Sequence, residues 1–155
     1  MKYEVEPVTE TDLKGILALQ KVCFQSEAEL YNDYAITPLT QDLASIKSEF
    51  RESTFLKVAE GAKIIASVRS QLKDATCHIS RLVVHPEFQN QGLGRLLMSA
   101  MESNSLSQHP ETKTFELFTG NKSEKNIALY KKLGYQVFKT KTLGTIEFVF
   151  MGKTF

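Results

Sequence analysis

Residues 83–98 read Val83-Val84-His85-Pro86-Glu87-Phe88-Gln89-Asn90-Gln91-Gly92-Leu93-Gly94-Arg95-Leu96-Leu97-Met98. The run from Leu82 to Val84, just before His85-Pro86, shows no polar alternation, which predicts a strand covered on both faces. Apolar residues after Gly92 recur at the spacing of one buried helical stripe. They are Leu93, Leu96, Leu97, Ala100 and Met101. The stretch therefore predicts a buried strand, a glycine-containing loop and an amphipathic helix, in that order.

The loop within this stretch, Gln89-x-x-Gly92-x-Gly94, suits the binding of a pyrophosphate group. The first amides of a helix lack internal partners, and the helix dipole favours negative charge at that end. Glycines remove the Cβ atoms that would keep a phosphate away from those amides, and Arg95 adds a positive charge. The alternative is that the two glycines only form a strand-to-helix turn.

The glycine pattern matches neither of the two common nucleotide motifs. A P-loop requires Gly-Lys-Ser/Thr, and a dinucleotide fingerprint requires a third glycine, and the loop has neither. A nucleotide-binding switch is therefore excluded, and an anionic ligand at this loop is expected to be of another kind.

Periodicity in the rest of the chain predicts further helices and strands. After a strand from Tyr3 to Val8, Thr9 is expected to cap a helix, with Asp12 as its capping-box partner. The remaining predicted elements are a helix over 38–50, strands over 55–59, 64–68, 77–84 and 114–118, a helix over 124–133 capped by Ser123, and strands over 136–142 and 145–151. This order predicts an α/β (α+β) sandwich around a mixed sheet. Without repeats or linkers, residues 1–155 are expected to form a single domain.

Composition narrows the class of protein. Of the 155 residues, 42% are hydrophobic and 24% are charged, the balance of a soluble globular chain. The net charge of +1 gives no indication of a nucleic-acid partner. No signal peptide and no run of about 18 apolar residues is present, so no membrane association and a cytoplasmic location are expected.

The two cysteines, Cys23 and Cys77, lie in apolar runs, where a buried free thiol is the ordinary interpretation. His78 follows Cys77 directly, but neighbours on a strand point to opposite faces, so the pair makes a poor catalytic dyad.

The loop and the elements on either side of it resemble those of the GNAT N-acetyltransferase superfamily. The family pattern V-x-P-x-x-[QR]-x-x-G-x-[GA] is met at every fixed position from Val84 to Gly94, and Leu133-Gly134-Tyr135 fits the family's usual ending after its last helix. The resemblance implies a mostly antiparallel sheet of six to seven strands, flanked by about four helices, with a splayed central strand pair. It also implies acetyl-CoA as cosubstrate, no metal, and a possible homodimer.

The resemblance further implies how acetyl-CoA is held. Pantetheine is expected to pair with the backbone of Leu82 and Val84, the Val83 amide to stabilise the carbonyl oxygen, and the loop amides to hold the pyrophosphate. The cofactor-binding residues implied in this way are Leu82, Val83, Val84, Gln89, Asn90, Gln91, Gly92, Leu93, Gly94, Arg95, Asn121, Ser123, Asn126 and Tyr130.

The resemblance assigns catalytic roles to Tyr130 and Asn126, which are four residues apart and share a helical face. A phenol with a pKa of about 10 stays protonated at neutral pH and is suited to protonating a departing thiolate. The alternative is a core aromatic at Tyr130 with Asn126 in a capping role. Many family members carry asparagine seven residues before the tyrosine, where this chain has Ser123, so the separate roles of Ser123 and Asn121 stay open.

The acceptor is expected to be a primary amine of a small molecule or peptide, attacking the thioester directly. Where relatives often carry a glutamate this chain has Ser80, so His78, Glu29 or a chain of waters stay open as the base. The segment from Phe24 to Leu39 is acidic and aromatic, which fits either a cationic amine or a solvated surface. The alternative function is a non-catalytic acyl-CoA-binding or regulatory module.

Overall fold

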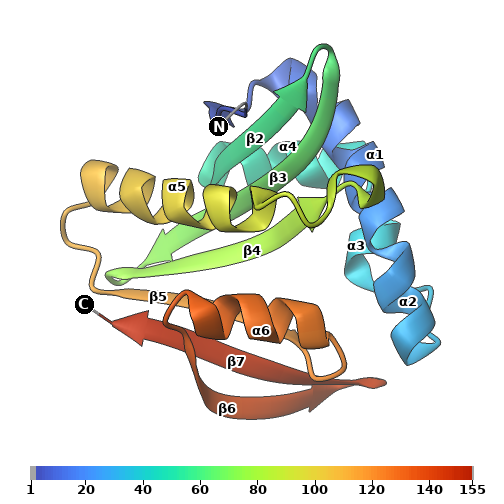
Figure 1. Ribbon diagram of the computed structural model, residues 1–155, viewed down its shortest axis with the longest axis vertical. Helices are drawn as coiled ribbons and strands as arrows, with labels where there is room; N and C mark the ends of the chain where they lie inside the picture. The colour runs from blue at the N-terminus through green and yellow to red at the C-terminus, as the bar shows by residue number, and fades with distance from the viewer. Residues whose placement is uncertain (1–2, 155) are drawn as a thin grey trace.

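The computed structural model describes residues 3–154 and contains one seven-stranded sheet of strand order β1-β2-β3-β4-β5-β7-β6 (Figure 1). Neighbouring strands are antiparallel except β4 and β5, which run parallel. The strands are β1 (Glu6–Pro7), β2 (Thr54–Glu60), β3 (Lys63–Lys73), β4 (Thr76–Val84), β5 (Thr114–Gly120), β6 (Gln136–Leu143) and β7 (Ile146–Thr154). The mixed, mostly antiparallel sheet expected from the sequence is confirmed.

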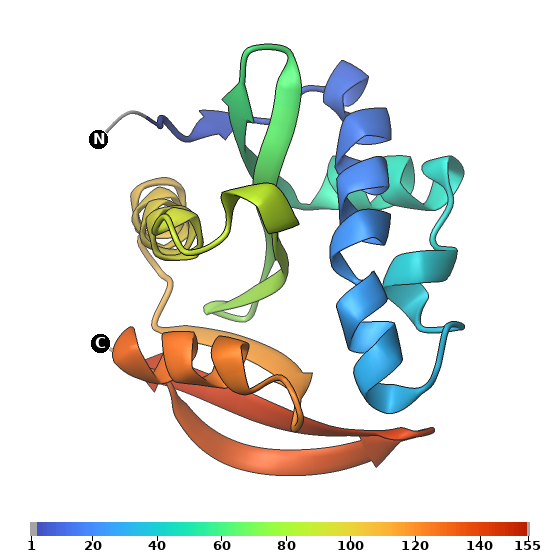
Figure 2. The same cartoon turned by 45° about the vertical axis from the view of Figure 1, so that its right-hand side comes forward.

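Helices cover both faces of this sheet. The described residues form α1 (Leu13–Cys23), α2 (Gln25–Tyr31), α3 (Thr37–Thr40), α4 (Leu43–Glu52), α5 (Leu93–Gln108) and α6 (Glu124–Lys132), with 3₁₀ turns at Glu10–Asp12 and Pro86–Phe88. Helices α5 and α6 lie on one face, and α1 to α4 lie on the other (Figures 1 and 2).

Apolar side chains on both faces explain this layering. On one face, the stripe predicted for α5 is buried against the sheet, with Leu93, Leu97 and Met101 at 1% exposure or less. On the other face, residues of α1 and α4 enclose a smaller core with the start of β2. Its fully buried members include Leu13, Ile16 and Ile46.

Strands β4 and β5 pair over only a short length. Their parallel register joins Thr76–His78 to Thr114–Glu116, and beyond His78 the two strands are no longer paired. Beyond this pairing β4 also contains a bulge, because two residues, Arg81 and Leu82, face the single residue Val68 of β3. Arg81 has a φ of +53°, a left-handed conformation that is uncommon for a side-chain-bearing residue. The splayed central pair expected from the family resemblance is therefore present.

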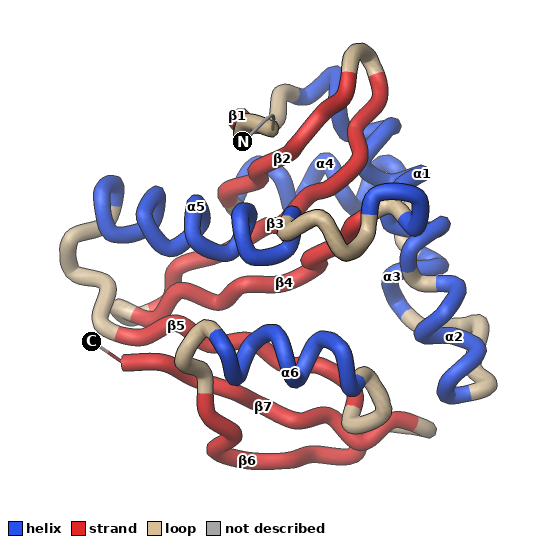
Figure 3. Tube along the Cα trace, in the orientation of Figure 1, coloured by secondary structure: helices blue, strands red, loops and turns tan. Residues whose placement is uncertain are grey.

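The structure differs from the sequence-based expectation in the N-terminal third. The predicted strand over 3–8 is reduced to Glu6–Pro7, and the predicted helix over 38–50 is broken into α3 and α4. Asp42 causes that break, because its carboxylate accepts a hydrogen bond from Ser45 N–H (2.8 Å) and starts a new helix. Helix α2 was not predicted, and with α3 it raises the helix count above the expected four (Figure 3).

Two capping predictions have different outcomes. The capping box at Thr9 is present, with its backbone N–H donating to Asp12 Oδ2 (2.8 Å). Ser123 does occupy the N-cap position of α6, but its hydroxyl makes no capping bond and donates to Glu27 instead. The cap predicted at Ser123 is therefore replaced by a contact between distant parts of the chain.

Candidate active site

The loop from Gln89 to Gly94 leads into the N-terminus of α5, the longest helix of the described chain. Asn90 and Gly92 both have positive φ angles, of +64° and +81°. The first helical hydrogen bond runs from Leu96 N–H to the Gly92 carbonyl (3.0 Å), which leaves the preceding amides without helical partners. The loop residues Gln89 to Gly92 and Arg95 are exposed, so an anion has access to these amides.

The two glycines of the loop serve different purposes. A Cβ atom on Gly92 would meet nothing within 4 Å, so this glycine is required by its φ angle and leaves open space in front of the helix. A Cβ atom on Gly94 would lie 3.2 Å from Leu129 Cδ2 and 3.7 Å from Leu82 Cδ2. Gly94 therefore allows α5 to begin close against both β4 and α6.

Beyond the bulge, the backbone of β4 has one open edge. The Val84 carbonyl accepts a hydrogen bond from Gln89 Nε2 (3.2 Å), and the Val84 backbone also hydrogen-bonds the Cys23 sulfur. Since His85 N–H donates to Ile65 in β3 (2.8 Å), the alternation of antiparallel pairing turns Val83 toward β3 and Val84 away from it. The Val84 groups therefore point to the edge that faces the gap, where an extended ligand would replace the contacts from Gln89 Nε2 and Cys23, whereas the Val83 amide faces β3.

Tyr130 lies on α6 with 6% exposure, and its ring contacts that of Tyr135 at a centroid distance of 6.2 Å. Burial raises the pKa of the Tyr130 phenol above its ordinary value, and the negative charge of Glu27 raises it further. Glu27 belongs to α2 and is held by the Ser123 hydroxyl. Asn126, four residues before Tyr130, is half-buried on the same helix, whereas Asn121 is exposed in the preceding turn and donates its backbone N–H to Glu147 (2.9 Å).

Helix α2 packs against the end of β5 and the turn that follows it. Besides Glu27, it supplies Tyr31, whose hydroxyl accepts a hydrogen bond from Lys122 N–H (2.8 Å). Just beyond the helix, Asp33 accepts one from the Thr145 hydroxyl (2.8 Å). In the sequence these acidic and aromatic residues form one group, and in the structure Glu27, Tyr31 and Asp33 anchor α2 and its following turn. Glu29, a candidate base, is exposed on the same helix.

The tight contact between Tyr31 and Gly120 yields a stability prediction. A Cβ atom at Gly120 would lie 1.9 Å from Tyr31 Oη, and Tyr31 is buried and hydrogen-bonded. We expect Gly120→Ala to lower the free energy of unfolding by about 1–3 kcal/mol, because overpacking forces the ring out of position. Chemical denaturation measures this. Gly152→Ala is the control, since its nearest contact would be 3.4 Å. Equal stability of both variants would show that Tyr31 moves freely.

A cavity of about 400 Å³ spans the separation between β4 and β5. Its walls come from α4, β3, β4, β5 and the β6–β7 hairpin, and α5 and α6 contribute nothing to it. The titratable or charged side chains that line it are Glu49, Arg69, His78, Arg81, Glu116 and Lys139. His78, one of the candidate bases, lies where the strands begin to separate, and its Nδ1 is 4.0 Å from Glu116 Oε1. Glu29 does not line this cavity.

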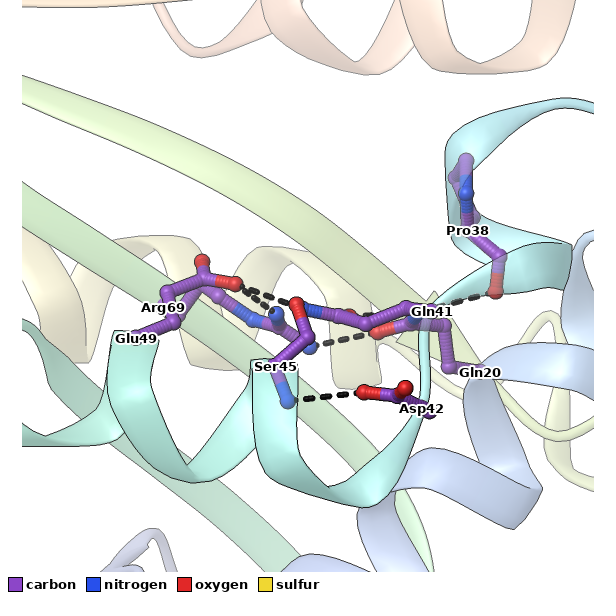
Figure 4. A network of polar contacts seen from close by, with 7 residues as sticks. All are labelled: Gln20, Pro38, Gln41, Asp42, Ser45, Glu49 and Arg69. Atoms are coloured by element: carbon purple, nitrogen blue, oxygen red, sulfur yellow. Dashed lines mark hydrogen bonds and ion pairs between the residues drawn. The ribbon is translucent and has the colours of Figure 1, made fainter.

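One wall of the cavity is fixed by a buried polar network around Arg69 (Figure 4). Arg69 is 2% exposed and donates to Glu49 Oε1 (2.9 Å) and to Gln20 Oε1 (2.5 Å). Gln41 joins the network by donating to Glu49 (3.0 Å) and accepting from Gln20 (3.0 Å). Burial lowers the pKa of Arg69 to about 10, and Glu49 opposes that decrease. The network occupies both Arg69 and Glu49 in structural contacts.

Three further observations concern metal binding, membrane spans and the cysteines. Within residues 3–154, no three histidine, cysteine or acidic side chains are grouped so that they could hold a metal ion. In the same residues, no helix has the length and apolar character needed to cross a membrane. Both cysteines are free thiols, and burial raises the pKa of Cys23 to about 12.

Solved structures share this fold over nearly the whole chain. The ribosomal-protein-S18-alanine N-acetyltransferase from Escherichia coli superposes with a TM-score of 0.78 at 18% identity, covering 98% of this chain and 93% of that one. A phosphinothricin acetyltransferase from Sinorhizobium meliloti in complex with AcCoA gives 0.77 at 17%, covering 99% and 89%. The PaiA N-acetyltransferase from Thermoplasma acidophilum, in complex with coenzyme A, gives 0.72 at 16% with full coverage of both chains. These similarities show the fold.

Among curated proteins, the chain is 24% identical over 130 residues to the UPF0157 protein YqkA of Bacillus subtilis (strain 168). The match covers 84% of this chain and 36% of that protein, so the chain spans about a third of the length of this relative. A family model described as "Acetyltransferase (GNAT) domain" matches residues 27–155, which include the loop, the splayed strands and Tyr130. The chain belongs to the GNAT acetyltransferase family.

Proposed function

We propose that this protein is an acetyl-CoA-dependent N-acetyltransferase that transfers the acetyl group to a primary amine by direct attack. One observation supports this most: the gap between β4 and β5 has a glycine loop with free helix amides beside it, a buried tyrosine on α6, and a 400 Å³ cavity on the opposite face. Donor and acceptor would therefore approach the gap from opposite faces of the sheet. A purely regulatory module that only binds acyl-CoA has no need of the cavity on the acceptor side.

The residues present fit acetyl-CoA. The amides before Leu96 and the Arg95 guanidinium would hold the pyrophosphate. The outward-facing backbone of Val84 would exchange its contacts with Gln89 Nε2 and Cys23 for the pantetheine amides. Gly94 would let the start of α5, and with it the pyrophosphate site, lie close to β4 and α6. When bound, acetyl-CoA supplies an activated acetyl thioester.

The reaction forms a C–N bond to the amine and breaks the C–S bond of the thioester. Tyr130 would give its proton to the departing thiolate, and the adjoining Glu27 keeps that phenol protonated. His78 would take the proton from the amine, and the Glu116 carboxylate, 4.0 Å from its Nδ1, would face the positive charge that forms on the imidazole. We prefer His78 to Glu29 as the base because only His78 lines the cavity. Asn126 would orient the donor on the helical face it shares with Tyr130.

The proposal is tested by ligand-induced stabilisation and by thiol release. Acetyl-CoA at about 100 times its dissociation constant should add about 2.7 kcal/mol and raise the Tm by about 5–10 °C. A panel of primary amines should then give thiol release that depends on the amine. Adenosine diphosphate is the control ligand, because it offers a pyrophosphate without pantetheine. An absent shift at millimolar acetyl-CoA would overturn the cosubstrate assignment, and a shift without turnover on any amine would favour the binding module.

The raised pKa of Tyr130 predicts the pH dependence. Only the protonated phenol can serve as an acid, so a raised pKa moves the loss of that acid to higher pH. An alkylamine acceptor has a pKa of about 10, so the fraction of reactive, uncharged amine increases as the pH rises toward that value. We therefore expect kcat/KM to rise steadily up to pH ~9.5, without an alkaline decline. Rates measured across pH, with preincubation controls for stability, check this. A decline centred below pH 9 would contradict the assignment of Tyr130.

A further inference from the structure

The side chain of Arg81 lines the cavity on the acceptor side of the gap. Its Nε atom is buried and has no hydrogen-bond partner among the described residues. Buried guanidinium groups are normally paired, because removing such a donor from water without a partner is costly. Since Nε itself is shielded, a ligand in the cavity would meet the terminal nitrogens of the Arg81 guanidinium, and the uncompensated Nε leaves this side chain poorly satisfied by the protein alone.

The local backbone supports a ligand-directed role for Arg81. The residue sits in the bulge of β4 with a left-handed φ of +53°, a conformation that costs of order 1–3 kcal/mol at a residue with a side chain. Bulges change the direction of a side chain next to a functional site. Here the bulge lies directly after Ser80 and before the open edge at Val84, so Arg81 is placed beside the site of transfer.

The charges around Arg81 favour an anionic partner. The negative charge of Glu49 acts on both Arg69 and Arg81, but its Oε1 already accepts hydrogen bonds from Arg69 and Gln41. Lys139 adds a third cation, positioned 4.7 Å from the centre of the Phe150 ring. Three cations and two carboxylates therefore line the cavity, and Glu49 is used by the network around Arg69.

The same cavity has an apolar wall. Phe118 and Phe150 pack with ring centroids 5.2 Å apart, and both line it from β5 and β7. Phe118 is 48% exposed, although it lies within a strand of a folded protein. The wall offers an apolar surface next to the two cations Arg81 and Lys139.

We infer that the acceptor is an amine that also carries a carboxylate, as an amino acid does, with the carboxylate held by the Arg81 guanidinium and an apolar side chain resting on Phe118 and Phe150. This inference rests on the proposed function and specifies its substrate class. It replaces the cationic acceptor that the acidic segment from Phe24 to Leu39 suggested, because Glu27, Tyr31 and Asp33 of that segment bind other parts of the chain.

Three probes of one skeleton test this inference: phenylalanine, its primary amide, and phenethylamine. In the acetyl-CoA-dependent reaction, we expect kcat/KM for phenylalanine to exceed that for each of the other two at least 10-fold. Arg81→Met should reduce the value for phenylalanine about 10- to 100-fold, as expected for a lost charged hydrogen bond, and change the other two less than 3-fold. Arg51→Met, on the exposed surface of α4, is the matched control and should change none.

Calorimetry with the coenzyme A complex measures the same preference without turnover. Phenylalanine should bind the wild type, and bind Arg81→Met at least 10-fold more weakly. Equal or stronger binding of phenethylamine to the wild type, or an unchanged preference in Arg81→Met, would overturn the inference even if acetyl-CoA binds and amines are acetylated. If Arg81→Met does not fold, the comparison of phenylalanine with phenethylamine on the wild-type protein is sufficient to test the inference. Failure of the proposed function shows separately, as a missing acetyl-CoA shift.

Discussion

Tyr130→Phe should lower kcat about 10²-fold or more while acetyl-CoA affinity stays within about 3-fold of the wild type. The hydroxyl is the group that would protonate the departing thiolate, and phenylalanine keeps the buried ring and its contact with Tyr135. Burial and the nearby Glu27 hold the phenol in its protonated form, so the native group is ready to donate. Steady-state rates with saturating acetyl-CoA, together with calorimetric affinity, separate the two effects.

Tyr135→Phe is the matched control for this variant. It removes the hydroxyl of the neighbouring buried tyrosine, which donates to Glu102 Oε2 (2.7 Å) and takes no part in the gap between β4 and β5. This variant should lose about 1–3 kcal/mol of stability, because Glu102 loses a partner, but should keep its turnover at temperatures well below its Tm. If Tyr130→Phe were as active as Tyr135→Phe, the proton donor would have to be another group.

Gly92→Glu should weaken acetyl-CoA binding at least 10²-fold. The new carboxylate would stand in the open space before the first amides of α5, where it would repel a pyrophosphate and compete for Arg95. Since a Cβ atom meets nothing within 4 Å at this position, the fold should tolerate the side chain apart from the strain of a left-handed backbone. Calorimetry or ligand-induced thermal shifts measure the loss of binding.

Two controls separate charge from strain in Gly92→Glu. Gly144→Glu introduces the same side chain at another exposed glycine with positive φ (+62°) and open space, in the turn between β6 and β7. It should bind acetyl-CoA as the wild type does. Gly92→Ala adds the strain without the charge and should bind within about 10-fold of the wild type. Wild-type affinity in Gly92→Glu would mean that the pyrophosphate lies elsewhere.

The sequence was most informative where one local rule governs the structure. The α5 stripe and the Thr9–Asp12 capping box each depend on residues a few positions apart, and each is present. The loop at Gly92 was recognised for the same reason. Its backbone angles and its position at a helix start follow from adjacent residues.

Contacts between distant parts of the chain were beyond such reasoning. Helix α2 has a weak pattern of its own and depends on Glu27 meeting Ser123 and Tyr31 fitting over Gly120, more than 85 residues away in each case. The buried state of Arg69 likewise requires Gln20 and Glu49 from two other helices. No spacing rule predicts these partners, so the sequence indicates a cap at Ser123 and gives no sign of the buried position of Arg81.

The short pairing of β4 with β5 also sets the size of what can be inserted between them. The gap is closed at one end by the pairing up to His78, and at the other end α1 and α2 contact both Val84 and the turn after Gly120. The open part of β4, from Ile79 to Val84, therefore measures at most about 20 Å at 3.3 Å per residue. The extended part of a ligand must fit within that length. The distance between the two closed ends of the gap therefore limits how long the extended chain bearing the acyl group can be.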